Sequence, residues 1–117
     1  MQFIENKQRV VTMAARLFQS ILLEVKNKVD FILGVVDSTG VITACTELKF
    51  IGENIEAAVE FFKTGLEEGQ FGGYTFHMIG GYEGGAENAV FAGSVGEQAS
   101  IVCALTAVAI KNSKTQY

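Results

Sequence analysis

Apolar and polar residues form their clearest pattern in residues 31–46. Residues 31–36 are apolar and rich in β-branched side chains, as a buried strand is. Residues 37–40, Asp-Ser-Thr-Gly, have the composition of a tight turn, with Asp first and Gly fourth. Two sets of side chains then alternate along residues 41–46. The pattern predicts a β-hairpin with two buried strands.

Two helices are predicted on either side of this hairpin. In residues 3–28, apolar side chains recur at intervals of three and four, which predicts a long amphipathic helix. These side chains are Val11, Ala14, Phe18, Ile21 and Val25. After the hairpin, Asn54 is expected to cap a second helix, and Gly69 is expected to end it in a left-handed conformation. Its buried side is expected to carry Ile55, Val59, Phe62 and Leu66.

The rest of the chain predicts a second hairpin and a last helix. Residues 74–79 and 88–92 read as strands, joined by the glycine-rich residues 80–85. Ser94 and Glu97 form a capping-box pattern, which predicts a helix from there to about Ser113 that is apolar nearly all round. The order is therefore α-β-β-α-β-β-α. We expect one α+β domain over residues 1–117, with an antiparallel four- to five-stranded sheet and flanking helices.

The composition predicts an interface with another protein chain and argues against nucleic acid and membrane as partners. The chain is 49% hydrophobic with a mean hydropathy of +0.28, more than one small protomer is expected to hide. Its net charge is −4, and residues 53–97 hold eight Glu and one Lys, so direct nucleic-acid binding is not expected. No apolar run approaches the ~20 residues that span a bilayer, and the N-terminus does not resemble a signal peptide. Cys45 and Cys103 are expected to be buried free thiols of a cytoplasmic protein.

Candidate chemistry is sparse. His77 is the only histidine, and no Cys or His is grouped with it as a metal site requires. Residues 80–85 join two strands and lack the Lys-Ser/Thr pair of a phosphate-binding loop. Tyr74, Phe76 and Met78 share one side of their strand, where they either line a ligand cavity or pack in the core. We expect no enzyme, no metal and no cofactor.

The stretch Asp37-Ser38-Thr39-Gly40-Val41-Ile42-Thr43-Ala44, followed by Ile51-Gly52, is similar to the D-x-x-G-x-I-x-A…I-G pattern of PAS/GAF-like sensor domains. It most resembles the N-terminal domain of bacterial transcription regulators of the sugar-diacid and purine-catabolism type. The C-terminal KNSKTQY also looks like that domain's exit helix. The resemblance implies a PAS/GAF/profilin-like fold and a place in the N-terminal part of a longer regulator. The chain also resembles the roadblock / dynein light-chain family, whose members are dimeric scaffolds and GTPase regulators without a small-molecule pocket.

These observations lead to one functional hypothesis and one alternative. The hypothesis is a cytoplasmic, non-enzymatic sensor domain that binds a small-molecule effector between the sheet and the second helix, and so tilts the terminal helices. The predicted ligand-binding residues are Thr46, Phe50, Tyr74, Phe76 and His77. The predicted homodimer interface consists of Val11, Phe18, Ile21, Val25, Ile101, Leu105 and Val108. The alternative is a roadblock-like dimeric scaffold or GTPase-regulatory interaction module without a ligand.

Overall fold

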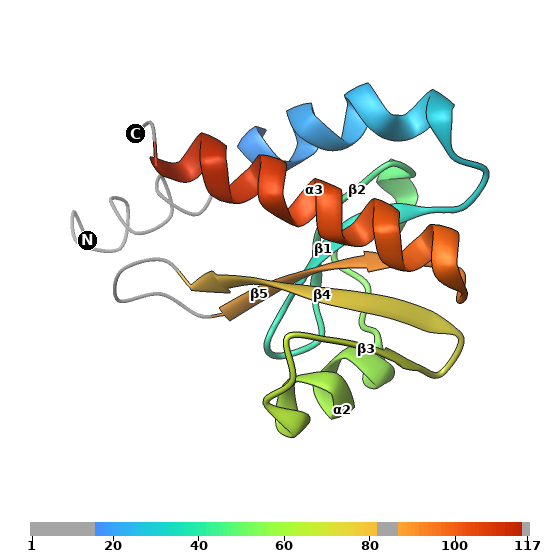
Figure 1. Ribbon diagram of the computed structural model, residues 1–117, viewed down its shortest axis with the longest axis vertical. Helices are drawn as coiled ribbons and strands as arrows, with labels where there is room; N and C mark the ends of the chain where they lie inside the picture. The colour runs from blue at the N-terminus through green and yellow to red at the C-terminus, as the bar shows by residue number, and fades with distance from the viewer. Residues whose placement is uncertain (1–15, 82–86, 116–117) are drawn as a thin grey trace.

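The computed structural model describes residues 16–81 and 87–115 (Figure 1). Val11 and most of the glycine-rich loop lie outside these ranges. The first described element is a helix over residues 16–25. The further elements are η1 (Lys26–Lys28), β1 (Leu33–Asp37), β2 (Ile42–Cys45), η2 (Leu48–Phe50), α2 (Glu56–Thr64), β3 (Glu68–Phe71), β4 (Tyr74–Gly81), β5 (Glu87–Ala92) and α3 (Glu97–Thr115).

The strands form one five-stranded antiparallel sheet in the order β2-β1-β5-β4-β3. The predicted α+β class and both predicted hairpins are confirmed. The strand β3 was not predicted. It pairs with β4 and adds a fifth strand at one edge of the sheet. A two-residue Gly72-Gly73 turn with φ values of 59° and 85° joins β3 to β4, and only glycine adopts such a turn without strain.

Helices cover both faces of the sheet (Figure 1). The helix at residues 16–25 and α3 lie side by side on one face, and α2 lies on the other. Alternation along β1 sends Leu33 and Val35 toward the first pair of helices and Val36 toward α2. In β5, Val90 and Phe91 divide in the same way. Because β1 and β5 are central and are covered on both faces, nearly every side chain in them is buried.

Position 34 in β1 requires glycine, because the Phe91 ring and the Ala44 backbone pack closely against it on the α2 side of the core. Gly34 pairs with Phe91, and a Cβ atom at position 34 would lie 2.5 Å from the Phe91 ring. The same atom would lie 2.6 Å from the carbonyl oxygen of Ala44. Backbone cannot move aside as the end of a flexible side chain can, so any side chain at position 34 would displace a strand.

Both ends of α2 differ from the prediction. The N-cap is Ile55, which makes no side-chain capping bond, while Asn54 forms an isolated bridge with Val41. The helix ends at Thr64, and Gly65 takes the left-handed conformation with φ 71° that was expected of Gly69. The Thr64 hydroxyl reinforces this end, because it donates to the Phe61 carbonyl and accepts from the Leu66 N–H.

The earlier helix end changes what faces the core. Ile55, Ala58 and Phe61 are buried, whereas Leu66 falls beyond the helix and is exposed. The predicted capping box of α3 is also wrong, because the helix begins at Glu97 and Ser94 lies too early to cap it. The Ser94 carbonyl instead accepts a hydrogen bond from the Thr75 hydroxyl at 2.8 Å.

We expect Gly34→Ala to lower the free energy of unfolding by about 2–3 kcal/mol, because the new methyl group overlaps strand backbone and a buried ring. Gly52→Ala is the matched control: its φ is 93°, but a Cβ there meets nothing within 4 Å. That change should cost only the conformational strain, about 1 kcal/mol. Urea unfolding of both variants measures the difference, and an equal or smaller loss for Gly34→Ala would contradict the packing argument.

Candidate functional site

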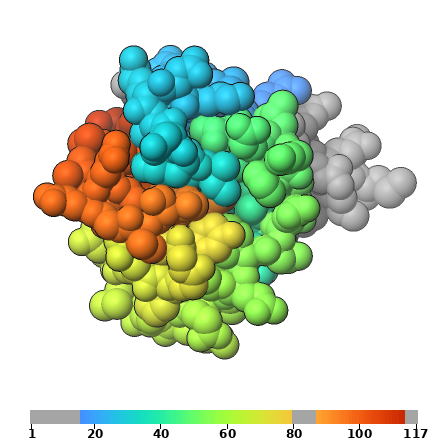
Figure 2. Space-filling model, turned by 90° about the vertical axis from the view of Figure 1, so that its right-hand side faces the viewer, coloured from blue at the N-terminus to red at the C-terminus, as the bar shows by residue number. Residues whose placement is uncertain are grey.

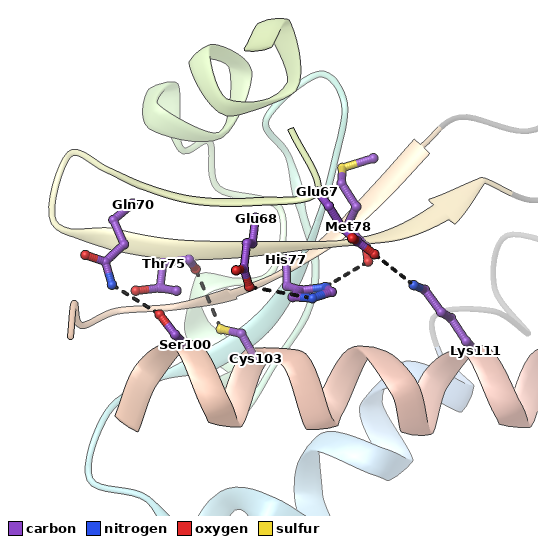
Figure 3. Close-up of polar contacts among 9 residues, drawn as sticks. All are labelled: Glu67, Glu68, Gln70, Thr75, His77, Met78, Ser100, Cys103 and Lys111. Atoms are coloured by element: carbon purple, nitrogen blue, oxygen red, sulfur yellow. Dashed lines mark hydrogen bonds and ion pairs between the residues drawn. The ribbon is translucent and has the colours of Figure 1, made fainter. Parts of the chain in front are cut away.

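The five predicted ligand-binding residues do not converge on one site. Phe50, Tyr74 and Phe76 border the core between α2 and the sheet. His77 follows Phe76 in β4 and therefore points to the other face of the sheet, toward α3 (Figure 3). The Thr46 side chain is buried and accepts a hydrogen bond from the Leu33 N–H at 3.2 Å, so its hydroxyl already has a backbone partner.

The layer between α2 and the sheet is occupied by aromatic rings. Phe61 of α2 stacks on Phe76 of β4, with ring centroids 5.1 Å apart and an interplanar angle of 15°. Tyr74 meets Phe91 edge to face at 6.1 Å. Met78 packs against the same cluster. Since the three phenylalanines are fully buried, the structure favours core packing for Tyr74, Phe76 and Met78, the second of the two interpretations left open above.

His77 connects β4 to the neighbouring strand. Its Nδ1 lies 3.1 Å from the Met78 carbonyl, an oxygen that can only accept a hydrogen bond. Nε2 lies 3.8 Å from Oε2 of Glu68 in β3, and the His77 side chain is only 12% exposed. Over the residues described, no three His, Cys, Asp or Glu side chains gather as metal ligands. The ring therefore contacts strand backbone and one carboxylate. These contacts favour a structural role for His77 over metal binding.

Polar contacts join β3 to α3 along one line, here called the β3–α3 seam (Figure 3). The Gln70 amide donates to the Ser100 hydroxyl and to the Gly96 carbonyl, both at 3.3 Å. Farther along α3, the Lys111 Nζ lies 4.0 Å from Glu67. These exposed contacts lie on the side of α3 that faces β3, and they leave the opposite side of the helix facing outward.

Both cysteines are free and buried, as predicted. Burial raises the pKa of the Cys103 thiol from 9.0 to about 12. Burial is also the largest cause of the raised pKa of Cys45, and the nearby Glu47 carboxylate adds to it. A thiolate is the reactive form of cysteine, so neither thiol is poised as a nucleophile near neutral pH.

The predicted interface residues separate into two groups. Phe18 is 2% exposed and belongs to the protomer's own core, so this expected interface residue packs inward. Ile21 and Val25 are partly buried against that core. On α3, by contrast, three large apolar side chains point outward, and we call them the α3 stripe. They are Ile101 (51% exposed), Leu105 (65%) and Val108 (50%).

The α3 stripe lies on one side of the helix, because its members are spaced by four and three residues. The opposite side carries Ala99, Cys103, Ala107 and Ile110, all buried against the sheet. The adjoining helix at residues 16–25 exposes Leu23 as well. In Figure 2, α3 in orange and the blue-to-cyan residues lie next to each other at the surface. The described residues thus leave the outer side of α3 apolar and exposed, and the neighbouring helix exposes one further large apolar side chain.

No protein-family model, curated protein or solved structure matches this chain. Within the described ranges, no helix combines the length and apolarity needed to cross a bilayer.

The raised pKa of Cys103 gives a pH dependence of stability. Between pH 9.0 and about 12, the folded state keeps the thiol proton that the unfolded chain releases. The stabilisation is therefore complete below pH 9.0 and is lost as the pH rises toward 12, by at most about 1.4 kcal/mol per pH unit. We expect urea unfolding of Cys103→Ala to show a shallower decline over this range than the unchanged protein. Parallel curves would contradict the assignment.

Proposed function

We propose that this protein is a non-enzymatic protein-interaction module that forms a homodimer through the outer side of α3. The observation that carries the proposal is the α3 stripe, whose three large apolar side chains are each at least half exposed. Fully burying one such side chain stabilises by roughly 1.5–3 kcal/mol, and about half of that gain is unused in the protomer. A twofold contact would bury two copies of the stripe at once.

An antiparallel pair of α3 helices is self-complementary in size. With Ile101 beside the second copy's Val108, Leu105 falls opposite the second copy's Ala104, which is a small residue. A large side chain opposite a small one allows two helices to approach to the usual 8–10 Å. Both contacts occur twice, because the axis relates each residue to the same set on the other copy.

The helix dipole of α3 supports the same arrangement. In an antiparallel pair, the positive N-terminal end of each helix lies beside the negative C-terminal end of the other. A second copy therefore fits the surface better than a partner whose helix runs parallel to α3.

The scaffold alternative accounts for the α2 side of the molecule better than the sensor hypothesis does. An effector between α2 and the sheet would have to displace the stacked rings of Phe61 and Phe76, both fully buried. Under this proposal the finer fold is the profilin-like one that the sequence resemblance implied, with dimerisation as its function. The five-stranded antiparallel sheet between two helical layers supports that assignment.

We expect the protein to be a dimer by size-exclusion chromatography with light scattering, and Leu105→Glu to convert it to a monomer. The new carboxylate would lose its water in the contact, at a cost of several kcal/mol. Leu48→Glu is the matched control, because Leu48 is also 65% exposed but lies in η2, away from α3. Circular dichroism shows whether both variants fold. A monomeric unchanged protein, or a dimer that survives Leu105→Glu, would refute the proposal.

We also expect no rise in Tm when small carboxylic acids and purines are screened at millimolar concentration. An effector present at 100 times its Kd would stabilise the folded state by about 2.7 kcal/mol, which shifts Tm by several degrees. A saturable shift of that size would support the sensor hypothesis instead.

A further inference from the structure

The two edge strands, β2 and β3, differ in whether their outward backbone groups are hydrogen-bonded. At the β2 edge, the Ile42 N–H donates to the Glu53 carbonyl and the Ile42 carbonyl accepts from the Gly52 N–H, both at 2.8 Å. Farther along, the Gln19 side chain bonds both backbone groups of Cys45, accepting from its N–H at 2.9 Å and donating to its carbonyl at 2.8 Å. The backbone of residues 52–53 and the Gln19 side chain thus bond the outward N–H and carbonyl groups of β2.

At the other edge, no hydrogen bond among residues 16–81 and 87–115 covers β3 in this way. The two-residue turn makes Phe71 and Tyr74 a hydrogen-bonded pair, so pairing alternates from there along the strand. The Met78 N–H donates to the Glu67 carbonyl, which agrees with this alternation. The backbone N–H and carbonyl groups of Glu68 and Gln70 therefore point away from β4. Among the strands that the structure describes, none lies beyond β3.

The centre of this edge is exposed among the described residues. Glu68 and Gln70 are exposed, and Gly69 between them has no side chain to hold another backbone away. A Cβ at position 69 would lie 2.8 Å from the Phe71 ring, so a side chain there would require that ring to move. Leu66, just before the strand, is exposed and offers an apolar contact beside the edge. An added strand can therefore form backbone hydrogen bonds with β3 and rest on an apolar neighbour.

Charge selects the occupant. The segment from α2 through β3, residues 56–71, contains one base, Lys63, which is paired with Glu60 at 3.7 Å. Its acids are Glu56, Glu60, Glu67 and Glu68, and of these Glu67 lies 4.0 Å from Lys111 of α3. Two copies of this edge would bring like charges together, while a basic strand would be attracted. We propose that β3 accepts an extended, basic segment of a partner protein as a sixth strand of the sheet.

The probe for this proposal is a peptide that alternates lysine and valine, with capped ends and a fluorophore. We expect saturable binding by fluorescence anisotropy, weaker at about 200 mM than at about 50 mM salt. Amide NMR signals of residues 68–71 should shift and become protected from exchange on binding. A glutamate–valine peptide should not bind. A lysine–valine peptide N-methylated on its hydrogen-bonding edge should bind about tenfold more weakly, because it keeps the charge but not the donors.

Two pairs of variants separate backbone pairing from charge. Gln70→Pro removes the outward N–H and leaves the ladder to β4 intact, as proline at an edge strand does. It should weaken binding about tenfold, whereas Gln70→Thr keeps the N–H and should bind as the unchanged protein does. Glu68→Gln should weaken binding about threefold and reduce its salt dependence. Glu47→Gln, before η2 near the opposite edge, is the charge control and should have no effect.

Equal binding of the N-methylated or acidic peptide, or insensitivity to Gln70→Pro, would overturn the proposal. If Gln70→Pro instead dissociates a dimer of the unchanged protein, the occupant of β3 is a second copy, and the partner segment is refuted. The inference is separate from the proposed α3 dimer. Peptide binding by the Leu105→Glu variant should match that of the unchanged protein, so either proposal can fail alone.

Discussion

The structure depends on a central pair of strands that are buried on both faces. Val35 and Val36 are neighbours in β1, yet both are fully buried, because one faces α3 and the other faces α2. A sheet with two apolar faces is stable only when helices cover each of them. The absence of a side chain at Gly34 lets the Phe91 ring lie across the strand, so the α2 layer can approach closely. Removing either layer of helices would expose the centre of the sheet to water.

That constraint accounts for one side of α3 and leaves the other side unexplained. Cys103 and Ala107 are buried because the sheet needs cover on this face. Within the part of the chain that the structure describes, no packing contact requires Ile101 or Leu105 to be apolar, since both point outward. Part of the high apolar content noted in the sequence is therefore located on this surface. A second copy is the partner whose shape and dipole this helix already matches.

Much of the architecture was predictable, because continuous apolar runs mark β1 and β5, while apolar residues alternate with Thr75 and His77 in β4. The strand β3 was missed because its sequence, Glu-Gly-Gln-Phe, has one large apolar residue and no alternation, as is common at an edge. The predicted terminator of α2 was Gly69, and only the backbone shows that Gly65 takes the left-handed conformation at the helix end. Glu67 and Glu68 were therefore assigned to the helix, although the second of them begins β3.

The predicted ligand site shows a different kind of error. Strand alternation alone places His77 on the opposite face from Tyr74 and Phe76, so these residues were never able to line one cavity. The interface prediction failed at Phe18 for another reason. Its helix has a broad apolar stripe, and periodicity does not say which part of a broad stripe meets the sheet. Gln19 could not have been predicted to bond Cys45, because the two residues meet only after the sheet has formed.

The two proposed surfaces are linked through the β3–α3 seam, and the strength of that link decides whether they act together. The Lys111–Glu67 pair is 4.0 Å long and largely exposed, and such a pair contributes about 0–1 kcal/mol. The hydrogen bonds from Gln70 to Ser100 and Gly96 are exposed and long, so each adds at most about 1 kcal/mol. A strand added at β3 would use backbone groups that point away from this seam. Occupation of the edge therefore changes the position of α3 little, and the helix and the edge behave as independent surfaces on one rigid sheet.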